Sequence, residues 1–487
     1  MKMKWRLSNI RLQFGVVVIG MMGSFADAGV AEVVRPNFIV IMGEAQGWAS
    51  MSVELDDAVP GSKDGFSRTP NFEKLAASGI RFGNFYAASP RCTPTRAALL
   101  TGKSPAQLHM TFVGEGKREE GTILGRKVLT PRGVLELPEV ETTIAEVLRR
   151  EGYATGHFGK WHLGRADLGK HGFEENDGAN NNGGPENVEN PNPKQAFLIT
   201  EKGIDFMVRQ AKAGRPFYLQ ISHYPGRGGT DARPETYAEL RKRAVSDEEL
   251  RKIGASAVRE DMDATLGMLL AKVEALGIGA QTYIIYTADH GAQGGNANGP
   301  LRGGKGTVWE GGVRVPLLMR GPGIKAGACT HVRASTVDIF PTVVALAGAK
   351  EALPSGIEGG SLVPVFGGAD AAKVKRSREE FVVHFPHYDK DKLGPASAIV
   401  LGNYKLIRPY ETGVARLFDL TKDRGEVHDL ARDKEREVAE LERRLSDYLS
   451  AVKAEMPVID ATFDGSAAKS FEERPGGKGG SSRGDEQ

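Results

Sequence analysis

The segment Cys92-Thr93-Pro94-Thr95-Arg96 combines a nucleophilic side chain with a guanidinium group. It opens a helical stretch that ends at Leu100-Thr101-Gly102, and Pro94 suits the first turn of such a helix. The N-terminus of a helix presents unpaired N–H groups and the positive end of the helix dipole, so it favours an anion. The pattern is short, and a buried structural thiol is the alternative interpretation of Cys92.

Three further polar clusters follow apolar runs of the chain. Lys160 and His162 close one run, and along an extended chain this spacing places both side chains on the same side. Asp289 and His290 leave another run and offer adjacent metal ligands, and Lys305 lies in a glycine-flanked basic loop. Taken singly, Lys160 and Lys305 are better interpreted as solvated loop charges, and His162 as a hydrogen-bonded structural histidine.

Together these clusters resemble the sulfatase family of the alkaline-phosphatase superfamily. The pattern C-x-P-x-R-x-x-x-L-x-T-G matches Cys92–Gly102, and G-Y-x-T-x-x-x-G-K-x-H matches Gly152–His162. Asp289-His290-Gly291 resembles D-[NH]-G, and R-G-G-K-G-x-x-x-E-G-G-x-R-V-P matches Arg302–Pro316. The resemblance runs from about Pro36 to about Ala454, and signatures in the right order strengthen one another.

The resemblance implies that a dedicated maturation enzyme oxidises Cys92 to formylglycine. One hydroxyl of the hydrated aldehyde attacks sulfur and displaces the alcohol, and loss of the proton from the other hydroxyl expels sulfate and restores the aldehyde. The resemblance also implies that Arg96 steadies the nucleophile, that Lys160 and Lys305 hold sulfate oxygens, and that His162 hydrogen-bonds the formylglycine hydroxyl.

The resemblance further implies a divalent cation, with Glu44, the group made from Cys92, Asp289 and His290 as its ligands. Calcium is the first expectation because it prefers oxygen ligands. Manganese is the second, since a nitrogen ligand at His290 shifts the preference slightly toward softer metals.

One position departs from the family pattern. The family's first strand usually ends in A-D-D-x-G, whereas this chain reads Gly43-Glu44-Ala45-Gln46-Gly47, and Ala45 offers no side-chain ligand. Gln46, water or the downstream pair Asp56-Asp57 are the candidate replacements. The aspartate pair is equally compatible with an ordinary solvated loop.

The leaving-group region also departs from the pattern. Sulfatases often carry a histidine after the strand at Phe217-Tyr218-Leu219, and here Arg227 falls at that place. Arginine is a poor general acid because its pKa is above 12, but it can stabilise a developing alkoxide or hold a carboxylate. His223 is the other candidate, and a strand-end histidine packed against a neighbour is its alternative interpretation.

An α/β fold positions these residues. Nearly continuous apolar runs indicate buried strands, at Asn37–Met42, Tyr153–Phe158, Phe217–His223, Thr282–Tyr286 and Val315–Met319. Amphipathic stretches between them indicate helices, at Asn71–Ser78, Thr142–Arg150, Glu201–Ala213 and Ala255–Leu276. The pattern predicts an α/β sandwich around a mostly parallel central sheet, with the site at the carboxyl ends of its strands. The resemblance implies that the sandwich is alkaline-phosphatase-like.

The C-terminal part has a different pattern. Short strands are predicted at Phe381–Phe385, Ser397–Leu401, Tyr404–Arg408 and Arg416–Leu420, followed by a charged helix at Lys434–Ala454. We therefore expect a large catalytic domain over 29–375, a small antiparallel sheet and helix over 376–461, and a disordered tail over 462–487. The polar stretch Asn176–Asn192 is either a pocket rim or a plain connector.

The N-terminus is typical of a secretory signal peptide over 1–28. A basic segment precedes the apolar run Phe14–Met22, and Ala26-Asp27-Ala28 fits a cleavage site. The run is shorter than the roughly 20 residues of a membrane-spanning helix, so we expect export to the periplasm or the medium and no span after cleavage. The net charge of +2 gives no sign of a nucleic-acid partner. The second cysteine, Cys329, matches no family motif and is interpreted as structural or incidental.

The leading hypothesis is a sulfuric ester hydrolase that acts on a sulfated small molecule or glycan, with a carbohydrate as the first expectation. That substrate class rests on family habit and on export. A phosphonate or phosphate ester hydrolase of the same superfamily is one alternative. A non-catalytic binding protein with a deficient metal site, suggested by Ala45, is the other.

Overall fold

The computed structural model describes residues 35–113, 126–182, 193–224, 231–293 and 296–463, which belong to one compact unit beginning at Arg35. At its centre lies an eight-stranded sheet with the order β10-β2-β9-β8-β1-β7-β5-β6. The strands of this sheet are β1 (Asn37–Gly43), β2 (Ile80–Phe82), β5 (Ala154–Gly159), β6 (Glu175–Asn176), β7 (Phe217–Ser222), β8 (Thr282–Ala288), β9 (Leu317–Arg320) and β10 (Ala328–Thr330).

The sheet is mostly parallel, as the apolar runs predict. β1 pairs in parallel with both β7 and β8, and β5 pairs in parallel with β6 and β7. The exception is β9, which runs antiparallel to β8 and β2, so the run at Val315–Met319 supplies the antiparallel strand of a mostly parallel sheet. The chain between β8 and β9 forms a loop and the short α8 (Glu310–Val313) rather than a long crossover helix, and a parallel return needs such a crossover.

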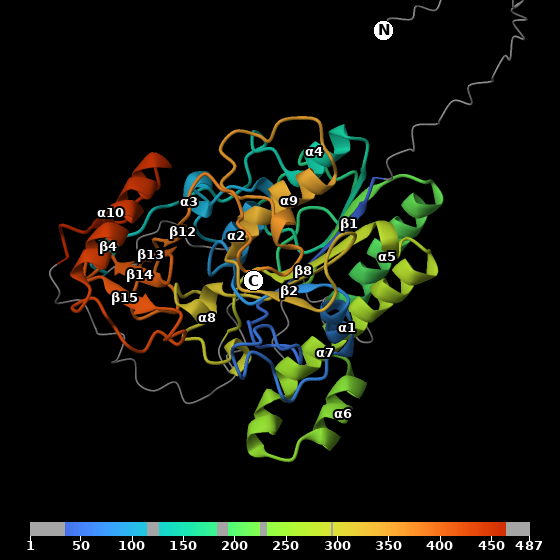
Figure 1. Ribbon diagram of the computed structural model, residues 1–487, viewed down its shortest axis with the longest axis horizontal. Coiled ribbons are helices and arrows are strands. Elements are labelled where there is room, and N and C mark those ends of the chain that lie inside the picture. Colours follow the sequence, from blue (N-terminus) through green and yellow to red (C-terminus); the bar gives the residue numbers. More distant parts are fainter. Residues whose placement is uncertain (1–34, 114–125, 183–192, 225–230, 294–295, 464–487) are drawn as a thin grey trace, which may run out of the picture. The chain divides into compact units, whose positions relative to one another are not determined.

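Helices cover both faces of the central sheet (Figure 1). Alternate side chains of β1 enter two separate cores, Ile39 and Ile41 on one face and Phe38, Val40 and Met42 on the other. The first core is completed by α1 (Pro70–Ala77), α5 (Ala196–Lys212), α6 (Pro234–Arg243) and α7 (Asp247–Ala275), and the second by α2 (Cys92–Thr101), α3 (Pro105–Leu108), α4 (Ile144–Arg150) and α9 (Ile339–Leu346). The predicted α/β sandwich is confirmed.

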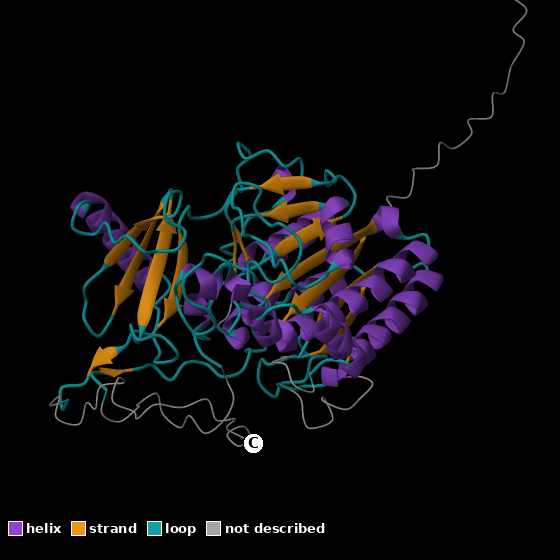
Figure 2. Cartoon of the chain, turned by 90° about the horizontal axis from the view of Figure 1, so that it is seen from below, coloured by secondary structure: helices purple, strands orange, loops and turns teal. Residues whose placement is uncertain are grey.

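A second, antiparallel sheet follows in the chain, with the order β12-β13-β14-β15 (Figure 2). Its strands are β12 (Phe381–Phe385), β13 (Ala396–Leu401), β14 (Tyr404–Pro409) and β15 (Arg416–Asp419). One face packs against α10 (Glu435–Ala451), and the other packs against Tyr86, Trp309 and Phe112 of the catalytic part. The predicted small sheet and helix are confirmed, while the domain boundaries at 375 and 461 stay a prediction.

The remaining elements are small. β3 (Phe85–Tyr86) pairs with β11 (Ala334–Ser335), and β4 (Val128–Leu129) pairs with β16 (Val458–Ile459). Short 3₁₀ turns lie at Pro193–Gln195, Gly279–Gln281, Asn296–Asn298, Thr336–Asp338 and Val363–Val365.

Both predicted ends of the chain fall largely beyond the described residues. The predicted signal peptide lies wholly outside them, and the tail lies outside them from residue 464 onward. Among the helices of the described residues, none combines the length and the apolar character needed to cross a bilayer.

Candidate active site

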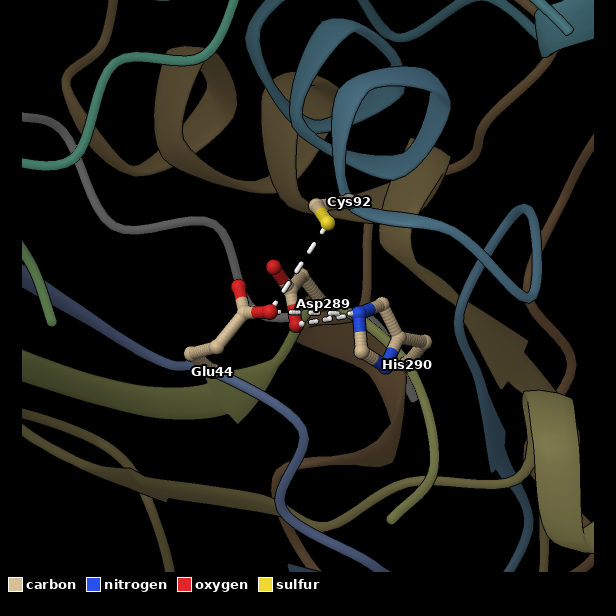
Figure 3. Close-up of side chains that lie close together, drawn as sticks. All are labelled: Glu44, Cys92, Asp289 and His290. Carbon is tan, nitrogen blue, oxygen red and sulfur yellow. Dashed lines mark hydrogen bonds and ion pairs between the residues drawn. The ribbon is translucent and has the colours of Figure 1, made fainter. Parts of the chain in front are cut away.

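The polar clusters singled out in the sequence converge at one edge of the central sheet, and Figure 3 shows four of these side chains, Glu44, Cys92, Asp289 and His290. This edge is formed by the carboxyl ends of the parallel strands β1, β8 and β5. The side chains come from the ends of those strands, from the first turns of α2 and from the loop after β8, and they are Glu44, Cys92, Arg96, Lys160, Asp289, His290 and Lys305.

Cys92 is the first residue of α2. The helix starts there because Arg91 is extended, and it ends where Gly102 adopts a left-handed conformation with φ of 66°. The buried Sγ of Cys92 lies 3.7 Å from Glu44 Oε1. Burial and Glu44 raise the pKa of the thiol, but Lys160, Lys305 and a histidine nearby outweigh them and hold it well below its ordinary value.

Glu44 is the anionic centre of the cluster. Its carboxylate accepts hydrogen bonds from Lys160 Nζ and Lys305 Nζ at 3.0 Å each, and Arg96 Nη2 lies 3.5 Å away. Burial raises the pKa of this carboxyl, yet the two ammonium groups keep it well below the ordinary value. Glu44 is therefore a buried, charged carboxylate, which is a suitable oxygen ligand for a cation.

Arg96 joins Cys92's helix to the end of β8. Its guanidinium donates to Asp289 Oδ2 from Nη2 at 3.0 Å and from Nε at 3.2 Å, and its Nη1 donates to the Lys160 carbonyl at 2.8 Å. Asp289 Oδ1 accepts from the backbone N–H of Ala45 at 3.1 Å, where Ala45 has a left-handed φ of 53°. Ala45 thus contributes a hydrogen bond that orients Asp289, in place of a carboxylate.

His290 points one ring nitrogen into the cluster. Its Nδ1 donates to the Gly291 carbonyl at 2.9 Å, and its Nε2 lies 3.5 Å from both Glu44 Oε1 and Asp289 Oδ1. Burial lowers the pKa of His290, but Asp289 outweighs it, and the pKa rises to about 9. Either a proton or a metal ion at Nε2 satisfies the two facing carboxylates.

The four candidate ligands fit a divalent cation. One donor atom each from Glu44, Cys92, Asp289 and His290 lies within 4.8 Å of the others. Among the described residues, His290 Nε2 makes no hydrogen bond, so once it loses its proton this buried nitrogen has room for a ligand bond. Two carboxylates and an imidazole form a donor set that suits a cation of intermediate hardness.

Lys305 reaches the cluster because its loop approaches the end of β8 closely. Gly291 donates its N–H to the Gly312 carbonyl, and a Cβ on Gly291 would lie 1.8 Å from the Gly311 oxygen. Only glycine allows this approach. The Lys305 backbone N–H then donates to the Ala292 carbonyl at 3.1 Å, which fixes the start of the side chain.

A sequence model of the sulfatase family matches residues 36–349, which is more than half of the chain. The chain belongs to the sulfatase family. A second model, for the C-terminal part of N-sulphoglucosamine sulphohydrolase, matches residues 304–455. This sulfatase is accordingly a sulfuric ester hydrolase, as the motifs predict.

Curated relatives support the same assignment. Human (Homo sapiens) arylsulfatase A is 32% identical over 427 residues, which cover 78% of this chain and 76% of that protein. Mouse (Mus musculus) N-acetylgalactosamine-6-sulfatase is 31% identical over 371 residues, with 68% and 66% covered. Among solved structures, Ps i-CgsB in complex with k-i-k-neocarrahexaose is similar in fold, with a TM-score of 0.70, 23% identity, and 85% of this chain and 93% of that chain covered.

His162 lies beside the start of α2 in the sulfatase. Its carbonyl accepts from Thr93 Oγ1 at 2.8 Å, its own N–H donates to the Asn180 carbonyl at 2.8 Å, and its backbone is left-handed with φ of 58°. The strand β5 ends at Gly159, so Lys160 and His162 follow it in a turn and not along an extended strand. Their shared location comes from this turn, which corrects the predicted extended spacing.

The two candidates for assisting the leaving group differ in what the structure describes. His223 Nε2 lies 3.4 Å from Thr265 Oγ1 of α7, and burial lowers its pKa to about 4. In this rotamer the imidazole packs against α7, so proton transfer to a substrate needs another rotamer. Arg227 lies outside the described residues.

Two contacts of the site were missed in the sequence. Asn182 Oδ1 accepts from Lys160 Nζ at 2.6 Å, so part of the polar stretch 176–192 touches the site. Arg91 forms a bidentate pair with Asp389 at 2.5 Å, beside Cys92. The position of Arg91 next to Cys92 was a sequence signal for its place at the site. No sequence signal pointed to Asp389. Asp56 and Asp57 contact His331 and are not among the four candidate ligands around Cys92.

Proposed function

We propose that this sulfatase uses formylglycine made from Cys92, together with a divalent cation, to release sulfate from a sulfated carbohydrate. The observation that carries the proposal is the position of Cys92, buried at the start of α2 and in contact with Glu44 in a group that also holds Asp289 and His290. A structural thiol has no need of three cations and two carboxylates around it.

Each residue of the cluster has a role in this proposal. Lys160 and Lys305 hold the sulfate oxygens and offset the charge that grows on them, and Arg96 fixes the orientation of Asp289. His162 hydrogen-bonds the nucleophile from the turn beside α2. The formylglycine supplies a nucleophile that regenerates itself, which an unmodified thiol does not.

Glu44, Asp289 and His290 would hold the cation, with the group made from Cys92 as a further ligand. When bound, the cation lowers the pKa of the attacking hydroxyl and balances the charge of the carboxylates. Calcium is proposed first, because the carboxylates supply most of the donor atoms, and manganese second because of the imidazole.

A carbohydrate substrate is supported by two comparisons. The C-terminal model is named for N-sulphoglucosamine sulphohydrolase, and several relatives are N-acetylgalactosamine-6-sulfatases. In the C-terminal segment, Asp389 pairs with Arg91, the residue before Cys92. The loop between β12 and β13 would therefore lie near the sugar of a bound substrate.

The test is sulfate release by the protein matured by a formylglycine-generating enzyme. A panel of sulfated glycans and an aryl sulfate is assayed beside the matching aryl phosphate, with calcium and with manganese. We expect turnover on a sulfated glycan and a slower rate on the phosphate. A faster rate on the aryl phosphate supports a phosphate ester hydrolase, and silence across the panel with a matured nucleophile contradicts the proposal.

The variant Cys92→Ala tests the nucleophile. It removes one sulfur atom from a buried position, so we expect a folded protein with no turnover above background. Melting temperature and circular dichroism report the fold, and mass spectrometry reports the absence of formylglycine. Activity that survives this change refutes the assignment of Cys92.

A further inference from the structure

The second cysteine, Cys329, lies in another group of metal-ligating side chains. It belongs to β10, His331 follows that strand directly, and Asp57 comes from the loop after β1. One ligand atom of each of these three residues lies within 4.8 Å of the other two. Cys329 is not in a disulfide, and Asp57 is half exposed, so solvent reaches the group.

His331 is held in the orientation that a metal ligand needs. Its Nδ1 lies 2.9 Å from Asp370 Oδ2, and its backbone N–H donates to Asp370 Oδ1 at 2.6 Å. Its Nε2 lies 3.1 Å from Asp56 Oδ1 and 3.2 Å from Asp57 Oδ1, so without a metal this nitrogen carries a proton that it donates to these carboxylates, and a bound metal ion would take the place of that proton. A carboxylate behind a histidine is the arrangement that usually orients metal-bound imidazoles.

The spacing of the donor atoms suits a small tetrahedral ion. Zinc bonds to nitrogen, oxygen and sulfur imply ligand atoms about 3.3 to 3.8 Å apart at tetrahedral angles. The 3.2 Å between His331 Nε2 and Asp57 Oδ1 is close to that range. Cys329 Sγ now donates to the Leu55 carbonyl at 3.6 Å, and it lies within 4.8 Å of the other donor atoms. A small movement of this side chain completes the set.

The charge around the group also calls for a cation. Asp56, Asp57 and Asp370 all contact His331. Asp56 is fully buried, and its Oδ2, which accepts no hydrogen bond within the described ranges, lies 3.6 Å from Arg424. Three carboxylates therefore face one guanidinium and one imidazole, so the group favours a further positive charge.

We propose that Asp57, Cys329 and His331 bind a zinc ion, with water or Asp56 in the fourth position. A thiolate and an imidazole favour zinc over calcium, whereas the cluster around Cys92 is richer in carboxylate. The ion links the loop after β1 to β10, two segments that are far apart in the sequence. The site is independent of the proposed catalytic function.

The test uses Co²⁺ as a spectroscopic probe on the whole protein, stripped with a chelator and kept reduced. A thiolate bound to cobalt gives an intense near-ultraviolet charge-transfer band. Cys92→Ser serves as the parent protein, because its other metal cluster then holds no thiolate. We expect the band in Cys92→Ser and its loss in the double variant Cys92→Ser/Cys329→Ser. A band that persists in the double variant, or no band in Cys92→Ser, overturns the proposal.

Zinc titrations of two milder variants separate ligation from folding. Asp57→Asn changes a half-exposed side chain and should weaken zinc binding without unfolding the protein. Asp370→Asn should weaken it about 10- to 100-fold, because the carboxylate behind His331 is lost. Lys422→Met, an exposed change elsewhere, is the control and should leave the affinity unchanged. Equal zinc affinity in the wild type and Asp57→Asn contradicts the assignment of that ligand.

Discussion

Ala45 decides the charge of the cluster around Cys92. The carboxylates Glu44 and Asp289 face three cations, all of which lie within 3.5 Å of Glu44. Ala45 contributes only its N–H, which donates to Asp289. A divalent ion here meets less negative charge than in a site with a second aspartate, so its affinity should respond strongly to one added carboxylate.

The variant Ala45→Asp adds that carboxylate. Aspartate tolerates the left-handed φ of 53° at this position better than most residues. We expect calcium to bind about tenfold more tightly or better, equivalent to about 1.4 kcal/mol. Calorimetry on the matured protein measures it, and Ala45→Asn is the control with the same shape and no charge. An equal gain in both variants means that charge is not the cause.

His290 predicts how metal binding depends on pH. Its pKa is raised to about 9 by Asp289, and burial raises the pKa of Asp289 to about 6. Both groups must lose their protons before they bind a cation, so the affinity should increase as pH rises. Between about pH 7 and 9, the titration of His290 alone should raise the affinity for the cation by up to about tenfold per pH unit.

The variant His290→Asn removes that titration and keeps an oxygen ligand. We expect the calcium affinity of this variant to change little above about pH 7, whereas the calcium affinity of the wild type continues to rise with pH. Calorimetric titrations at three pH values compare the two slopes. Identical slopes in both proteins mean that His290 is not a ligand.

At the scale of elements, a buried ionic network holds the loop of Lys305 against the C-terminal sheet. Lys405 of β14 lies 2.9 Å from Glu310 of α8 and 2.8 Å from Glu426. Arg314 donates to the other oxygen of Glu310 at 2.8 Å. Burial raises the pKa of Glu310, but Lys405 and Arg314 lower it to about 2, so its carboxylate stays charged.

Replacement of Lys405 should leave Glu426 without its counter-charge and Glu310 with Arg314 alone. For Lys405→Met we expect a loss of about 3–5 kcal/mol in the free energy of unfolding, as for other broken buried pairs. The loop with Lys305 should also loosen, which raises KM for the sulfate ester. Denaturant unfolding and steady-state kinetics measure both effects. Lys422→Met is the exposed control, and equal stability of the two variants contradicts the role of the network.

At the scale of the whole molecule, the two sheets share a core. Tyr86, Phe112 and Trp309 from the catalytic part pack with Phe385 and Phe418 of the small sheet. Helices cover both faces of the central sheet. The apolar surface formed by Tyr86, Phe112 and Trp309 is covered by the second sheet instead.

A fragment over the predicted domain 29–375 should therefore fail as an enzyme. It exposes Trp309 and Phe112 and leaves Glu310 without Lys405. We expect aggregation or strong binding of a hydrophobic dye, with no sulfate release. The control over 29–461 lacks only the predicted tail and should keep the activity of the longer chain. A stable, active 29–375 fragment contradicts the shared core.

Local patterns were sufficient for most of the fold. The apolar runs identify β1, β5, β7 and β8 because strands buried on both faces contain few polar residues. They do not specify the direction of β9, which depends on the connection from β8. The helix α9 was missed because it is apolar on every side and contains Pro341, so it has no amphipathic pattern.

The sequence by itself determined the chemical groups of the site and the edge at which they meet. Cys92, Lys160 and Asp289 follow or adjoin parallel strands, and the carboxyl ends of such strands lie together. Tertiary structure alone decided the partners that are distant in the chain. Arg91 meets Asp389 across 298 residues, and Asp57, from the loop after β1, meets His331. Such pairs have no local signature, because packing and not sequence spacing brings their side chains into contact.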